Sequence, residues 1–183
     1  MGFIQWCLAH LNYWTIMFLM AIESSFIPFP SEIIVPPAAW MAATGQNGLN
    51  VFLVILFATI GAGIGAAVNY ILSLLLGRPI VYAFANSKLG HLCLINEEKV
   101  RYAERYFDKN GAVSTLVGRL IPAVRQLISI PAGLARMKFL PFISYTMLGA
   151  GIWNCILAAI GYNLAKVPGI ETQEQLLEKV NKY

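Results

Sequence analysis

Long hydrophobic runs without any charge alternate along the chain with short segments that contain proline and charged residues. Residues 1–22, 33–77 and 139–165 contain no Asp, Glu, Lys or Arg. A helix needs about 20 apolar residues to cross a bilayer, so residues 51–76 and 139–165 each predict a transmembrane helix. The runs lack the strict alternation that is typical of half-buried strands. The pattern therefore predicts an all-α integral membrane protein.

Composition strengthens this interpretation. Hydrophobic residues make up 58% of the 183 residues and charged residues only 12%, about half the charged share of a soluble domain. No Lys or Arg precedes the first apolar run, which continues into a second one, so we expect a retained membrane element and not a cleaved signal peptide. Tryptophans such as Trp153 are expected to anchor segment ends at the membrane interface.

The basic residues are confined to two regions. Residues 1–77 contain no Lys or Arg, whereas residues 78–109 and 136–138 are rich in them. The positive-inside rule places both basic regions in the cytoplasm. The mostly apolar stretch 111–136 lies between them and must enter and leave the membrane by the same face. It therefore predicts a re-entrant hairpin, with breaks at Pro122, Pro131 and Gly133.

Residues 23–44 have the same character, with Pro28 and Pro30 as breaks and a Gly-Gln-Asn-Gly turn signal directly after them. Each predicted hairpin is joined to one of the two long helices. The halves 1–77 and 111–165 therefore predict an inverted repeat within a single membrane domain that covers residues 1–183.

Two further helices are predicted outside the hairpins. Residues 95–110 have Asn96 as a helix cap and apolar positions at helical spacing. They predict an amphipathic helix at the membrane interface, with a linker helix in water as the alternative. Residues 171–183 alternate acid and base around three apolar positions and predict a short surface helix.

Four charges lie within the proline-broken segments. Glu23 and Glu32 bracket the first break, and Arg119 and Arg125 bracket the second. Because a charge at bilayer depth costs at least a few kcal/mol, we expect acids and arginines to meet across the hairpins. They form either fixed ion pairs or a site in which the arginines bind a phosphate and a carboxylate carries protons. Both roles can coexist.

Neighbouring polar residues can support such a site, and the sequence contains no sign of an enzyme. The supporting candidates are Ser31, Gln126 and Ser129. There is no HExxH, GxSxG, P-loop or cysteine cluster, so we expect no catalytic residue, no metal site and no cofactor. The net charge of +4 arises from bases that flank membrane segments, which argues against nucleic acid as a partner.

Two motifs resemble the signatures of the DedA family, also called the VTT or SNARE-associated domain family. They are ESSFIPFPSE at 23–32 and GRLIPAVRQLISIPAGLARM at 118–137. The resemblance implies re-entrant hairpins in an inverted repeat and multi-pass insertion in the bacterial inner membrane. It also implies transport of a lipid, above all undecaprenyl phosphate, driven by the proton motive force, with Glu23 and Glu32 as coupling candidates. Family members commonly carry an aspartate where this chain has Ala66, so a role for that acid is not carried over.

Two other transport functions remain open at this point. The glutamates could bind a small cation or drug in a proton-coupled antiporter, with the arginines only setting their affinity. A general phospholipid scramblase would show neither a head-group preference nor a dependence on a proton gradient. The sequence also leaves open whether the protein forms a homo-oligomer.

Overall fold

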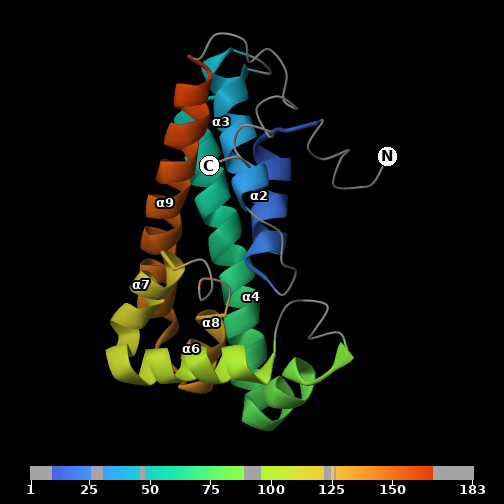
Figure 1. The fold of residues 1–183 in the computed structure, drawn as a ribbon, viewed down its shortest axis with the longest axis vertical. Coiled ribbons are helices and arrows are strands. Elements are labelled where there is room, and N and C mark those ends of the chain that lie inside the picture. Colours follow the sequence, from blue (N-terminus) through green and yellow to red (C-terminus); the bar gives the residue numbers. More distant parts are fainter. Residues whose placement is uncertain are drawn as a thin grey trace.

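A computed structural model describes residues 10–25, 31–45, 48–88, 96–121, 125 and 127–166. Every regular element in these residues is a helix (Figure 1). The elements are α2 (Tyr13–Glu23), η1 (Ser31–Ile33), α3 (Val35–Ala43), α4 (Val51–Ala85), α6 (Glu97–Asn110), η3 (Gly111–Val113), α7 (Ser114–Arg119), α8 (Ser129–Leu134) and α9 (Phe139–Leu164).

The two long helices α4 and α9 pack against each other and form the axis of the molecule (Figure 1). They are antiparallel, because Thr59 lies against Asn154 while Gly63, further along α4, lies against the earlier Met147. Both are long and apolar enough to cross a membrane. The predicted helices at 51–76 and 139–165 are therefore confirmed as helices.

Helix α4 bends just after the predicted span. Gly77 has φ 70° and ψ 175°, a backbone conformation that residues with a Cβ rarely adopt. Pro79 follows, and the helix then continues to Ala85. The segment after the bend packs on α6, and Val81 and Ala85 belong to the same buried apolar cluster as Val100.

Helices α2 and α3 are the two arms of the expected first hairpin. Helix α2 runs parallel to α4, because the Asn50 N–H donates to the Tyr13 hydroxyl at one end and Ser24 packs on Gly65 further along. Helix α3 runs parallel to α9, with Pro36 against Gly161. The two arms are therefore antiparallel, and their tip lies partway along α4.

Helix α2 begins upstream of the stretch 23–44, where the first hairpin is expected. Helix α2 begins at Tyr13, where the Asn12 side chain accepts from the backbone N–H of Trp14 and Thr15 and Thr15 bonds back to the Asn12 N–H. This capping box starts a helix directly in the uncharged run. Glu23 is thus the last residue of the first arm and lies at the tip.

The stretch 111–136 contains two short helical arms. Arm α7 packs on α9, and arm α8 packs on α4. Pro131 and Gly133, expected as breaks, both lie inside α8. Pro131 is its third residue, where a helix tolerates proline. A Cβ on Gly133 would lie 2.5 Å from the Tyr70 carbonyl oxygen, so glycine allows the backbones of α8 and α4 to approach.

The arms of the two expected hairpins pack against matching positions of α4 and α9. Gly61 and Gly149 each lie ten residues after the first residue of their helix. Gly61 packs on the first arm of its own hairpin, at Met17, and Gly149 does the same at Leu116. Twelve residues further on, α4 and α9 each contact the second arm of the other hairpin. These second contacts are Ser73 with Gly133 and Gly161 with Pro36.

Helix α6 lies across one end of this bundle (Figure 1) and falls within the predicted amphipathic segment 95–110. The Asn96 side chain caps it by accepting from Lys99 N–H, and Val100, Ala103 and Phe107 are buried. Its polar side pairs with the end of α4, where Arg78 Nε is 3.1 Å from Glu104 Oε1. The expected helix at 171–183 lies outside the described residues.

The close backbone contact at Gly161 predicts a position-specific cost of adding a methyl group. In Gly161→Ala the new Cβ would collide with the Pro36 backbone, and we expect a loss of about 1–3 kcal/mol in unfolding free energy. Thermal unfolding in detergent, followed by tryptophan fluorescence, measures this change. Gly151→Ala in the same helix is the control, because its Cβ meets nothing closer than 3.7 Å and alanine favours helices. Equal melting temperatures for both variants would contradict the close packing of α3 on α9.

Candidate functional site

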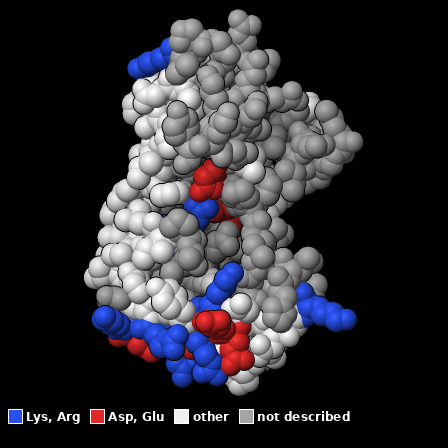
Figure 2. Space-filling view, viewed as in Figure 1, with Lys and Arg blue, Asp and Glu red and all other residues white. Residues whose placement is uncertain are grey.

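The tips of the two hairpins meet beside α4 and α9 and bring the predicted charges together. Glu23 ends α2 and Glu32 lies in η1, while Arg119 ends α7 and Arg125 follows it in the connection to α8. Figure 2 shows acidic and basic side chains halfway along the molecule, well above the broad band of charge at the α6 end. The expected meeting of acids and arginines is therefore present in the structure.

Helix α4 holds the end of α2 in place. A helix end leaves backbone carbonyl groups without a helical partner. The Asn69 side chain donates from Nδ2 to the Ser24 carbonyl oxygen at 3.2 Å, and the Ser25 hydroxyl donates to the Ile22 carbonyl oxygen. These bonds fix Glu23 at the tip.

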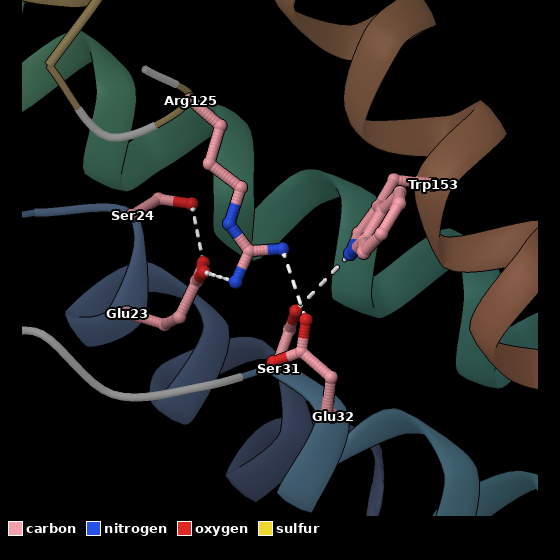
Figure 3. A network of polar contacts seen from close by, with 6 residues as sticks. All are labelled: Glu23, Ser24, Ser31, Glu32, Arg125 and Trp153. Atoms are coloured by element: carbon pink, nitrogen blue, oxygen red, sulfur yellow. Dashed lines mark hydrogen bonds and ion pairs between the residues drawn. The ribbon is translucent and has the colours of Figure 1, made fainter. Parts of the chain in front are cut away.

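Arg125 joins both carboxylates of the first hairpin (Figure 3). Its Nη2 lies 2.9 Å from Glu23 Oε1, and its Nη1 lies 3.5 Å from Glu32 Oε1. The Ser24 hydroxyl donates to the other oxygen of Glu23 at 3.0 Å. Glu23 is 4% exposed, whereas the Glu32 side chain is 35% exposed. The ion pair of Arg125 with Glu23 is therefore shorter and less exposed to solvent than its pair with Glu32.

Trp153 of α9 completes the surroundings of Arg125. The Arg125 guanidinium lies 5.5 Å from the centre of the Trp153 ring, within the range of a cation–π interaction. The indole N–H of Trp153 donates to the Ser31 hydroxyl at 3.4 Å. Trp153 was expected at a membrane interface, but it is part of the charged site, and no pattern in the sequence distinguished it from the other tryptophans.

Arg119 is buried, and its guanidinium group has few hydrogen-bond partners among the described residues. It is 4% exposed, and its Nη2 donates to the Ser129 hydroxyl at 3.3 Å. Its Nε has no hydrogen-bond partner, and it forms no ion pair with a described carboxylate. A buried guanidinium without a carboxylate is costly unless it has another use. Arg119 therefore has donors available for an anion.

A small cavity of about 20 Å³ connects these groups, large enough for roughly one water molecule. Both arginines and Glu23 line it, together with Met20, Ser24, Ser31, Ala62, Ala150, Trp153 and Asn154. Asn154 also donates to the Thr59 hydroxyl of α4 at 3.1 Å. The second hairpin thus contributes cations to this cavity and the first contributes an anion.

The sequence did not single out Asn154 as part of the site. The available signal was an uncharged polar residue inside an apolar helix, which is also the character of Asn69. Asn69 is buried beside Ser24, and its Oδ1 has no partner. Ala66 is fully buried on the same helix.

The other predicted site residues divide into two groups. Ser31 and Ser129 touch the site, since Ser31 accepts from Trp153 and Ser129 accepts from Arg119. Pro28, Pro30, Pro122 and Gln126 lie outside the described residues. Within the described part of the chain, no cluster of three His, Cys, Asp or Glu side chains could hold a metal ion.

Comparison with known proteins gives a consistent result. Residues 29–163 match the VTT domain family. An alkaline phosphatase-like protein of Lactococcus lactis subsp. lactis is 37% identical over 87% of this chain and 75% of its own length. Undecaprenyl phosphate transporter A of Staphylococcus aureus is 29% identical over 86% and 76%. Protein DedA of Escherichia coli K12 is 26% identical over 85% and 68%. No solved structure matches this chain.

The geometry predicts that the two glutamates differ in their effect on stability. Glu23→Gln breaks the buried pair with Arg125, which should cost about 3–5 kcal/mol. Glu32→Gln breaks a longer and more exposed pair and should cost about 1 kcal/mol or less. Thermal unfolding of the purified variants in detergent would show the order.

A double variant checks that the effect comes from the pair. In Glu23→Gln combined with Arg125→Met, the glutamine no longer faces a buried charge, so the loss should be smaller than the sum of the two single losses. Strictly additive losses, or equal losses for the two glutamate variants, would contradict the pairing.

Proposed function

This chain belongs to the DedA family of VTT-domain membrane proteins, and from that membership and its site we propose that it transports a polyprenyl phosphate, of the undecaprenyl phosphate class, across the bacterial inner membrane. The observation that carries the proposal is Arg119, a buried guanidinium whose Nε has no partner among the described residues, beside a cavity that Arg125 also lines. Arginine forks suit the oxygens of a phosphate.

The proposed arrangement in the membrane is an inverted repeat of two re-entrant hairpins. Its support is the matched packing of the hairpins on α4 and α9, at Gly61 and Gly149 for the first arms. The antiparallel direction of α4 and α9 inverts one half relative to the other. Broken elements that meet near the midplane form the binding site in many secondary transporters.

The basic end of the molecule gives the proposed orientation. Positive charge at α6 and at the end of α4 places that end in the cytoplasm by the positive-inside rule. The described residues that contribute are Arg78, Lys88, Lys99, Arg101, Arg105, Lys109, Arg136 and Lys138. In this orientation the interfacial helix α6 lies on the cytoplasmic surface, and the multi-pass chain exposes large apolar residues such as Phe52 and Leu140 to lipid.

The ion pairs define how a phosphate would enter. A cavity of about 20 Å³ is too small for a phosphate group, so the tips of the hairpins must separate slightly. The phosphate then takes the donors of Arg119 and replaces Glu23 on Arg125. The described charges of the site cancel, two against two, and an entering anion exchanges one partner of Arg125 for another.

This exchange gives a physical basis for proton coupling. A carboxylate that loses its arginine in a buried site is costly as an anion and is neutralised by taking up a proton. Glu23 is the inner carboxylate and Glu32 the more exposed one. Glu23 is therefore the proposed proton carrier, and Glu32 the group that exchanges protons with the outside.

The name of the Lactococcus relative raises a phosphatase as an alternative. Phosphate ester hydrolysis through a covalent intermediate needs a nucleophile activated by an adjacent base. The residues that line the described cavity offer the hydroxyls of Ser24 and Ser31, and the only carboxylate among them is held by Arg125. Transport without bond cleavage fits this lining better.

Reconstituted translocation tests the proposal. In proteoliposomes, Arg119→Ala and Arg125→Ala should lower undecaprenyl phosphate translocation at least about tenfold, because each removes phosphate donors worth more than 1.4 kcal/mol. Arg105→Ala is the control, since Arg105 is an exposed arginine of α6. Phosphatidylcholine should not be moved, and a pH gradient should accelerate the phosphate lipid.

Two outcomes would replace the proposal. Equal movement of undecaprenyl phosphate and phosphatidylcholine without any effect of pH would indicate a scramblase. Proton-coupled cation transport that survives the arginine substitutions but is lost in Glu23→Gln would indicate an antiporter.

A further inference from the structure

A second hollow lies on the outer side of α4 where the helix bends. Its volume is about 210 Å³, and it is lined by Leu72, Ser73, Leu76, Ile80, Val81, Phe84 and Ile130. Ser73 is the single polar side chain in this lining, and its hydroxyl already donates to the Asn69 carbonyl oxygen at 2.7 Å. The hollow therefore offers no free polar group and suits hydrocarbon.

This hollow lies at the bend at Gly77. Leu72 and Leu76 precede the bend, and Ile80, Val81 and Phe84 follow it. The left-handed conformation of Gly77 redirects the helix, so residues on both sides of the bend line one pocket, which Ile130 of α8 closes. Leu76 is 42% and Ile80 50% exposed, so the pocket is open to the surroundings of the helix pair.

Two separate elements connect this pocket to the charged site. On α8, Ser129 accepts from Arg119 and the next residue, Ile130, lines the pocket. On α4, Asn69 holds Ser24 of the charged cavity, and Ser73 of the pocket lies four residues later. Four helical residues span about 6 Å. Ser73 of the pocket therefore lies about one helical turn along α4 from Asn69, which bonds to Ser24 of the charged cavity.

We propose that this pocket binds the first part of the hydrocarbon chain of the transported lipid while its phosphate is at Arg119. The inference rests on the proposed function and adds a second recognition element to it. An apolar cavity of about 150 Å³ stays dry and accepts benzene, so a pocket of about 210 Å³ accepts a short stretch of chain. The rest of the chain extends through the open side into the bilayer.

Neighbouring leucines provide a matched test. Leu76 lines the pocket, whereas Leu75 is 74% exposed on the same helix and does not. Leu76→Trp should fill the pocket and lower the affinity for undecaprenyl phosphate at least about tenfold, and Leu75→Trp should leave it unchanged. Binding to the purified protein in nanodiscs, measured by native mass spectrometry, provides the affinities. Inorganic phosphate as competitor probes the head-group site alone and should displace the lipid in both variants.

Cross-linking locates the chain directly. An undecaprenyl phosphate that carries a diazirine in its first isoprene unit should label residues 72–84 or Ile130 in the wild-type protein, and this labelling should be lost in Leu76→Trp. Equal affinities of the two tryptophan variants, or labelling only elsewhere, would overturn the pocket assignment. Lipid binding that is unaffected by Arg119→Ala would instead overturn the phosphate site, so the two failures are distinguishable.

Discussion

The cost of placing charge between two apolar helices is the constraint on which the rest of this structure depends. Glu23 and Arg125 are both buried halfway along α4 and α9, and neither is tolerable there without the other. Because one hairpin supplies the acids and the other the arginines, the two tips must meet. A buried ion pair is weak evidence for stability, since apolar residues of similar size often do as well. The ion pair alone therefore does not explain why the site is charged, and exchange with a ligand is the proposed reason.

The packing of the hairpins follows from this requirement. Glycines allow the arms to lie directly against the long helices, as at Gly65 under the end of α2 and at Gly149, whose Cβ would lie 2.7 Å from the Cβ of Arg119. Small residues at helix contacts are the usual way in which membrane helices approach closely. Any larger residue at these two positions would push a charged tip away from its partner. The glycines thus set the geometry of the site as well as the packing.

Sequence reasoning was most successful where a single energetic term dominated. The cost of a charge at depth singled out Glu23, Glu32, Arg119 and Arg125, and the length of the uncharged runs predicted α4 and α9. It was less successful where geometry decides. Pro131 was expected to break a hairpin, but it fits within the first turn of α8. Trp153 and Asn154 reach the site only because α9 packs beside both tips, which no local pattern reveals. The capping box of Asn12 and Thr15, which sets the start of the first arm, is a local signal in the sequence.

Arg119 and Arg125 lie symmetrically around Pro122 in the sequence, so the difference in their ion pairing could not be predicted. This difference carries the functional argument. Arg125 holds both carboxylates, whereas among the described residues Arg119 bonds to the Ser129 hydroxyl and has an Nε without a partner. If both arginines were ion-paired, an anion would have to break two contacts before it gained one. Because Arg119 has no carboxylate partner among the described residues, an entering anion would bind Arg119 first. It would then compete with Glu23 for Arg125, and the released Glu23 carboxylate could take up a proton. On α8, Ser129 accepts from Arg119 and the next residue, Ile130, lines the apolar pocket, so one short helix contributes to both features.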